Sequence, residues 1–111
     1  MKAKVAKVTD DDFNKRVLES DKPAVVDFWA QWCTPCRQLD EILEEIAHEY
    51  DDRVSFYRVD VNESNVTASR YAVRSIPMLL FFNEGEVVGQ AVGSLSKEML
   101  KEKLGKLLNY I

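Results

Sequence analysis

The strongest constraint on the fold lies in residues 24–50, where one hydrophobic pattern gives way to another. Ala24 to Trp29 is a short and almost continuous apolar run, which is typical of a strand buried on both faces of a sheet. From Cys36 onward, apolar residues recur at helical spacing and charged residues fall mostly on the other side, which predicts an amphipathic helix. The apolar positions are Leu39, Ile42, Leu43, Ile46, Ala47 and Tyr50. A buried strand followed closely by such a helix favours an α/β domain.

The middle of the chain supplies further elements of this kind. Val54 to Val61 is rich in β-branched and aromatic residues and is expected to form a second central strand. A short helix near Asn65–Tyr71 follows. Met78–Phe82 and Val87–Val92 flank a turn in which Gly85 can adopt a positive φ, so they predict a β-hairpin.

A helix is expected at each end of the chain. Thr9 to Asp12 can cap a helix from about Asp11 to Ser20. The last segment carries apolar residues at helical spacing after a cap at Ser94 or Ser96, namely Leu100, Leu104, Leu107, Leu108 and Ile111. No repeat or linker divides the sequence, so we expect one domain over residues 1–111. The order of elements predicts a central mixed β-sheet flanked by α-helices on both faces.

Composition narrows the functional classes. The 111 residues are 46% hydrophobic with a net charge of -4, which suits one compact domain with a real core. No long basic run is present, which argues against nucleic-acid binding. The first residues, Met1 to Lys7, include positive charges without the apolar stretch of a secretory leader or membrane span. The chain is therefore expected to be cytoplasmic.

Trp32-Cys33-Thr34-Pro35-Cys36 stands at the junction between the predicted strand and helix. The first turn of a helix has unpaired N–H groups and a partial positive charge, both of which stabilise a thiolate. Cys33 is therefore the natural nucleophile for disulfide exchange. Cys36 is three residues on, close enough on a helix to form a disulfide with it. We expect Cys33 to attack a partner disulfide and Cys36 to release the partner, leaving a Cys33–Cys36 bridge.

Other interpretations of the two cysteines are weaker. A bridge over so short a loop stabilises a fold little, because it removes little entropy from the unfolded chain. A structural zinc site needs four ligands, and the one histidine, His48, is predicted to lie on the solvent face of its helix. Simple core packing of the cysteines would leave the neighbouring tryptophan and proline unexplained. No metal site is expected.

At this point the sequence resembles the thioredoxin family over nearly its whole length. The resemblance rests on several motifs in order: Val26-Asp27-Phe28-Trp29-Ala30, the Cys-Thr-Pro-Cys segment, Val59-Asp60-Val61-Asn62, Tyr71-Ala72-Val73-Arg74-Ser75-Ile76-Pro77, the Gly85 turn and Val92-Gly93. It implies the thioredoxin fold and a protein-disulfide reductase that serves electron transport and cell redox homeostasis.

The resemblance also implies the surroundings of the cysteines. Cys36 would be the more buried thiol, and the Ile76–Pro77 peptide would be cis beside the pair. The backbone there would pair with an extended substrate segment. The docking surface around Cys33 would be flat and mostly apolar, formed by Trp32, Thr34, Pro35, Ile76, Pro77, Val92 and Gly93. No bound cofactor is implied. Electrons would come from NADPH through a flavoprotein thioredoxin reductase, the partners would be that reductase and disulfide-containing proteins, and the chain would be a monomer.

Asp27 interrupts an apolar strand, so we expect a buried carboxyl with a raised pKa. By resemblance it would take the proton of Cys36 through a water as that thiol attacks. Arg58 stands where the family usually places a lysine. If it approaches Asp27, its fixed positive charge would hold the pKa of Asp27 lower than burial alone would.

Three departures from the family pattern lie near the cysteines, and none of them removes a catalytic group. Thr34 replaces a glycine between the cysteines, which leaves the reduction potential open. Glu41 replaces a helix-kinking proline, so the helix is expected to be straighter. Met78 replaces a threonine after the proline and adds an apolar, oxidisable contact. Two alternatives stay open beside a reductase: a disulfide oxidase or isomerase of the same fold, and a thioredoxin-like binding subunit.

Overall fold

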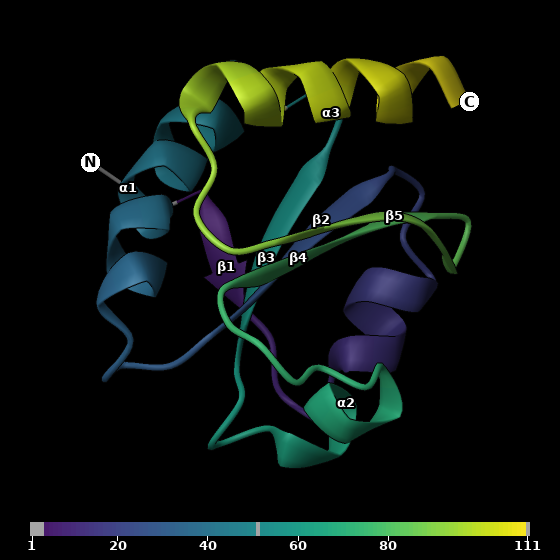
Figure 1. The fold of residues 1–111 in the computed structure, drawn as a ribbon. Helices are drawn as coiled ribbons and strands as arrows, with labels where there is room; N and C mark the ends of the chain where they lie inside the picture. Colours follow the sequence, from purple (N-terminus) through teal and green to yellow (C-terminus); the bar gives the residue numbers. More distant parts are fainter. Residues whose placement is uncertain (1–3, 51, 111) are drawn as a thin grey trace.

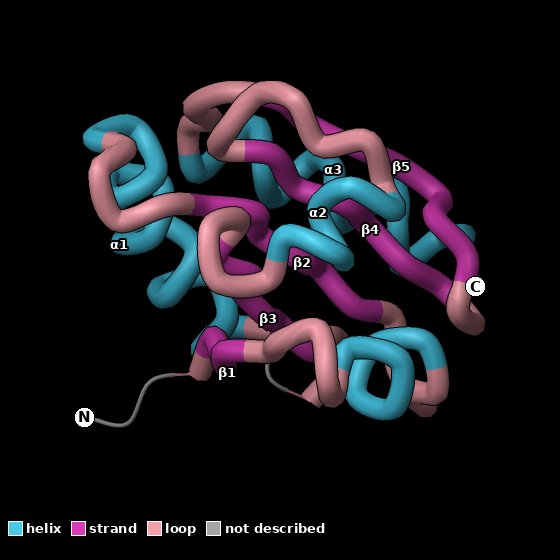
Figure 2. Tube along the Cα trace, turned by 90° about the horizontal axis from the view of Figure 1, so that it is seen from below, coloured by secondary structure: helices cyan, strands magenta, loops and turns pink. Residues whose placement is uncertain are grey.

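Five strands form one mixed sheet in the computed structural model, which describes residues 4–50 and 52–110 (Figure 1). They are β1 (Val5–Lys7), β2 (Ala24–Trp29), β3 (Ser55–Asp60), β4 (Met78–Asn83) and β5 (Glu86–Val92). Figure 2 shows them side by side in the order β1-β3-β2-β4-β5. β1, β3 and β2 run parallel, whereas β4 is antiparallel to β2 and β5 to β4. The predicted mixed sheet is confirmed, with β2 at its centre.

Helices cover both faces of this sheet, as predicted (Figure 1). α1 (Thr34–Glu49) and α3 (Lys97–Tyr110) pack on one face, and η1 (Asn14–Leu18) and α2 (Asn65–Arg70) on the other. Alternate residues of β2 divide between the two cores. Val25 joins the α1 and α3 core, whereas Val26 and Phe28 join the core beneath η1 and α2.

The first helix differs from the prediction. An α-helix from Asp11 to Ser20 is wrong, because η1 is a single widened π turn in which Glu19 N–H donates to Asn14 C=O at 3.1 Å, five residues back. The hydroxyl of Ser20 then accepts the N–H of Lys22 and donates to its C=O, which closes a local loop and ends the helix.

Asp10 also has a different role from the predicted one. Its carboxylate caps α2, accepting the N–H of Thr67 at 2.8 Å, the hydroxyl of Thr67 at 2.6 Å and the N–H of Val66 at 3.3 Å. These bonds satisfy N–H groups that the first turn of a helix leaves unpaired. A cap supplied from more than fifty residues away ties the start of the chain to α2.

β1 is an element that the sequence pattern does not predict. It is three residues long and pairs in parallel with β3, with Val5 opposite Phe56. Val5 is buried, so this short strand closes one edge of the α1 core.

The hairpin is confirmed. Glu84 and Gly85 form its turn with φ values of 52° and 80°. Only glycine suits the second position, because a Cβ there would lie 2.9 Å from the carbonyl oxygen of Leu18. Of the two predicted caps for α3, Ser96 is the one used, since its hydroxyl accepts Met99 N–H at 3.1 Å. Ile111 and Met1 to Ala3 lie outside the described residues.

No helix in residues 4–50 and 52–110 combines the length and the apolar character that crossing a membrane requires.

Candidate functional site

The two cysteines lie at the first turn of α1 and are joined by a disulfide. Cys33 is the residue that caps the helix, and its Sγ accepts the backbone N–H of Cys36 at 3.2 Å. Pro35 occupies an early helical position, where a missing N–H costs no hydrogen bond. The predicted placement of Cys33 at the positive end of a helix dipole is therefore confirmed. Thr34 and Pro35 are exposed beside it.

The two sulfur-bearing residues differ in burial in the expected direction. Cys36 is fully buried, whereas Cys33 keeps 5% of its surface exposed even in the disulfide. They form a small core cluster with Ala30, against which Ile76 and Val61 pack. The inner sulfur is thus shielded by the body of the protein and the outer one borders the surface.

A loop on the other side of the cluster supplies the neighbouring surface. The Ile76–Pro77 peptide is cis, as expected from the family resemblance. Gly93 N–H donates to Pro77 C=O at 2.8 Å, and Met78 pairs with Val92, so this loop is fixed to the end of β5. Val92 is 55% exposed.

The predicted docking residues differ in how much of their surface is exposed. Ile76 packs directly on the cysteines, and Trp32, beside Cys33, is an exposed large apolar side chain at 68%. Pro77 is buried, so it presents backbone rather than side chain.

Asp27 is buried in the sheet, as predicted, with 1% of its surface exposed. Neither carboxyl oxygen has a hydrogen-bond partner within the described part of the chain. Burial raises the pKa of Asp27 from 3.8 to about 7, the nearby Arg58 charge lowers it and the Asp40 carboxylate raises it. Asp27 is two residues after Val25 along β2, so both side chains face the side of the sheet covered by α1, the helix that carries Cys36.

Arg58 takes up an unexpected partner. It lies opposite Asp27 in the β2–β3 register, but its Nη2 pairs with Oδ1 of Asp40 and lies 3.7 Å from Oε2 of Glu44 on α1. Its guanidinium carbon is 6.0 Å from the centre of the Trp29 ring. Arg58 therefore lowers the pKa of Asp27 through space and not through a hydrogen bond. Asp40 and Glu44 were absent from the predicted site, although their spacing of four residues does place them on one helix face.

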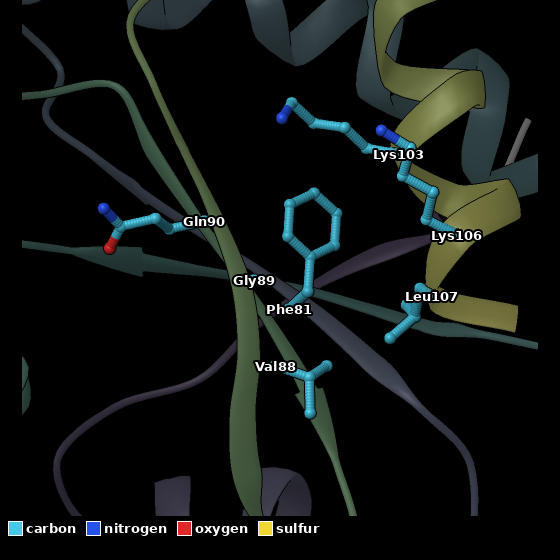
Figure 3. Close-up of a pocket in the computed structure, with 7 residues that line it drawn as sticks. All are labelled: Phe81, Val88, Gly89, Gln90, Lys103, Lys106 and Leu107. Carbon is cyan, nitrogen blue, oxygen red and sulfur yellow. The ribbon is translucent and has the colours of Figure 1, made fainter. Parts of the chain in front are cut away.

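A hollow in the structure lies away from the cysteines. It has a volume of about 150 Å³ and lies between β5 and α3, as Figure 3 shows. Its lining residues are Phe81, Val88, Gly89, Gln90, Lys103, Lys106 and Leu107. None of them belongs to the cysteine cluster, so this hollow is separate from the cysteine site.

Metal ligands do not gather at the site. Over residues 4–50 and 52–110, no three His, Cys, Asp or Glu side chains are grouped to hold a metal ion. The solvent-face position predicted for His48 is only partly right, since its side chain is 29% exposed and its Nε2 lies 4.0 Å from Glu44.

Comparison with known proteins gives a consistent result. The family model described as Thioredoxin matches residues 4–106. The "Thioredoxin" of Buchnera aphidicola subsp. Acyrthosiphon pisum is 46% identical over 106 residues, covering 96% of this chain and 98% of that protein. "Thioredoxin 2" of Chlorobaculum tepidum is 43% identical, covering 94% and 95%. "Thioredoxin" of Acidithiobacillus ferridurans is 48% identical, covering 84% and 86%.

Proposed function

Because the chain belongs to the thioredoxin family and is a thiol–disulfide reductase, we propose that Cys33 attacks the partner disulfide and Cys36 resolves the intermediate. The observation that carries this division is the position of Cys33 as the cap of α1, at the edge of the surface, with Cys36 fully buried behind it. We also propose that residues 1–111 form a single domain that contains both cysteines.

The first exchange uses the ionised sulfur of Cys33. The N–H groups and dipole of the first turn of α1 favour the thiolate over the thiol. That thiolate attacks one sulfur of the partner disulfide, forms a mixed disulfide with it and expels the other partner sulfur as a thiolate.

The second exchange uses Cys36 and Asp27. The Cys36 thiol passes its proton to the Asp27 carboxylate, directly or through a water, and the resulting thiolate attacks Sγ of Cys33. The remaining partner sulfur leaves as a thiolate, and two electrons have moved from the Cys33–Cys36 dithiol to the partner. A pKa near 7 suits Asp27 to this exchange, because the group can both accept and release a proton at neutral pH.

Substrate docking is assigned to the apolar surface beside Cys33. Trp32, Thr34, Pro35, Ile76 and Val92 would contact the partner's side chains, while the backbone at Pro77 and Gly93 would pair with an extended partner segment. Arg58 would lower the pKa of Asp27 from the neighbouring strand.

The oxidised pair must be reduced again after each turnover. We assign this step to a flavoprotein thioredoxin reductase that takes electrons from NADPH, so the chain itself needs no bound cofactor. Its other partners are disulfide-containing proteins, it works as a monomer with its docking surface free, and it acts in the cytoplasm. The match to the family model over residues 4–106 supports this assignment.

A trapping experiment tests the division of roles. Cys36→Ser should capture a disulfide-containing peptide as a stable mixed disulfide at Cys33, detected by mass spectrometry, whereas the matched variant Cys33→Ser should capture none. Insulin reduction by dithiothreitol should be accelerated by the unchanged chain and by neither variant. Capture by Cys33→Ser and not by Cys36→Ser would reverse the assignment. A measured potential above about −200 mV would point to an oxidase or isomerase instead.

A further inference from the structure

Arg58 and Asp27 are neighbours in the sheet that do not form an ion pair. The β2–β3 register places them opposite each other, and facing residues of adjacent strands project to the same side. An arginine beside a buried carboxylate would ordinarily bind it with two parallel hydrogen bonds. Yet both oxygens of Asp27 are without a hydrogen-bond partner in the described part of the chain.

Two carboxylates of α1 hold the guanidinium elsewhere. Nη2 of Arg58 is in contact with Oδ1 of Asp40 and lies 3.7 Å from Oε2 of Glu44. The three side chains are 20%, 40% and 27% exposed, so the group lies at the border between core and solvent. Glu44 is itself engaged by the backbone N–H groups of Lys4 and Val5, which leaves Asp40 as the principal partner of the arginine.

We propose that Asp40 is a positioning residue, which holds the Arg58 guanidinium against α1 and so keeps it from binding the Asp27 carboxyl. The inference rests on the proposed role of Asp27 in proton transfer and extends it to a residue whose side chain pairs with Arg58. Asp40 acts in two ways. It engages the arginine by direct contact, and its own negative charge opposes the arginine's effect at Asp27.

The other groups around Asp27 do not offer an alternative. On β4 its partner is Leu79, which is uncharged, and on α1 the buried Cys36 is bound in the disulfide. Asp60, further along β3, is turned to the backbone N–H groups of Asn62 and Glu63 at 2.9 and 3.3 Å. Arg58 and Asp40 are thus the two charged groups whose balance acts on Asp27.

The substitution Asp40→Asn tests this positioning role. Asp40→Asn removes a negative charge near Asp27 and frees Arg58 to turn toward it, and both changes favour the ionised carboxylate. The pKa of Asp27, about 7 in the unchanged protein, should fall by roughly one unit. The matched control is Glu41→Gln, which removes the same charge from the next residue of the helix, where the side chain is exposed. It should shift the pKa of Asp27 much less.

The pKa of Asp27 is measured by following its carboxyl ¹³C chemical shift against pH in the oxidised protein, where neither cysteine titrates. The same variants are then assayed for the rate of mixed-disulfide resolution across pH 5–9. In an Arg58→Gln background, Asp40→Asn should shift the titration less than it does in the unchanged protein, because only the direct charge effect remains.

The outcomes separate this inference from the proposed function. Equal shifts of the carboxyl titration in Asp40→Asn and Glu41→Gln, or equal shifts of Asp40→Asn in the two backgrounds, overturn the positioning role. A lower pKa of Asp27 in Asp40→Asn with an unchanged pH profile of resolution supports the positioning role and removes Asp27 from the mechanism. A lower pKa together with a pH profile displaced to lower pH supports both.

Discussion

Asp10 and Asp27 lie on opposite sides of the sheet and differ in their hydrogen bonds and in the direction of their pKa shifts. On the α2 side, Asp10 accepts three hydrogen bonds from Val66 and Thr67, and these bonds lower its pKa, with the Thr67 hydroxyl as the largest cause. On the α1 side, Asp27 is buried without any such donor in the described residues, and burial raises its pKa to about 7. A carboxylate that accepts hydrogen bonds keeps a low pKa and can link two elements of the fold. A buried carboxylate without donors has a raised pKa and can exchange a proton at neutral pH.

The packing on the two sides of the sheet also differs. The α2 side is a close-packed core in which Phe13, Tyr71 and Phe82 contact one another with ring centres 5.5–5.9 Å apart. The α1 side has a similar apolar core but also contains Asp27 and the ion pairs of Arg58 with Asp40 and Glu44. We therefore expect substitutions on the α2 side to change stability alone, and substitutions near Asp27 to change chemistry and pH dependence.

The largest expected effect is on the α2 side. Phe13 is fully buried, so Phe13→Ala should lower the free energy of unfolding by about 3–5 kcal/mol through lost burial and a cavity. Urea unfolding measures this loss, and Lys15→Ala, an exposed change in the same segment, serves as the control. The rate of insulin reduction per folded molecule should stay the same. A reduced rate in the folded protein would break the division between the two sides.

The next effect is a pH dependence of stability set by Asp27. Its pKa is about 7 in the folded protein against 3.8 in the unfolded chain, so the folded state binds the proton more tightly. The resulting stabilisation is complete below about pH 4 and is lost as the pH rises through 7. At about 1.4 kcal/mol per pKa unit, the unchanged protein should lose about 4 kcal/mol relative to Asp27→Asn between those limits. Denaturant unfolding of the oxidised forms measures the difference, and parallel pH profiles for the two proteins would contradict it.

The third effect concerns the rate of reaction. Asp27→Asn cannot accept a proton from Cys36, so release of the mixed disulfide at pH 7 should slow by roughly 100-fold. Stopped-flow measurement of release separates this step from the attack by Cys33, which should proceed at nearly its normal rate. Raising the pH should restore the variant in part, because Cys36 then ionises without assistance. An unchanged release rate would remove Asp27 from the mechanism.

The smallest effect is expected at the other aspartate. Asp10→Ala removes the cap of α2 and should lower the melting temperature by a few degrees without altering insulin reduction. Asp11→Ala, an exposed aspartate at the next position, is the matched control and should have little effect. Because the hydrogen bonds favour the ionised form of Asp10, its contribution is present at neutral pH and is lost as the pH falls through its lowered pKa. Equal melting temperatures for the two variants would show that the cap does not stabilise α2.

The sequence predicts most of the sheet because its strands are marked by local patterns. β2 is apolar except for Asp27, β4 is apolar except for its last residue, Asn83, and Gly85 marks the hairpin turn. β1 carries no such mark, since it is three residues long and stabilised by pairing with β3. The role of Asp10 is likewise invisible locally, because the helix it caps begins more than fifty residues later.

At the site, too, the sequence predicts the features that local patterns determine but not the contacts between distant side chains. The position of Cys33 follows from the junction of strand and helix, and the burial of Asp27 follows from the apolar residues on both sides of it. The pairing of Arg58 does not follow, because the register fixes only the face on which a side chain begins. The long side chain of Arg58 can reach acidic residues on more than one helix or strand, and in this structure it pairs with Asp40 on α1.

The hydrogen bond from the Cys36 amide to the Cys33 sulfur has a consequence for turnover. The Cys33 sulfur that accepts this bond in the first turn of α1 is also the sulfur that bonds first to the partner and then to Cys36 in each turnover. Its ability to accept that bond differs between a thiolate, which is charged, and a disulfide sulfur, which is not. We therefore expect this hydrogen bond to differ in strength between the reduced and oxidised forms, so that the Cys36 amide should report the redox state of the protein.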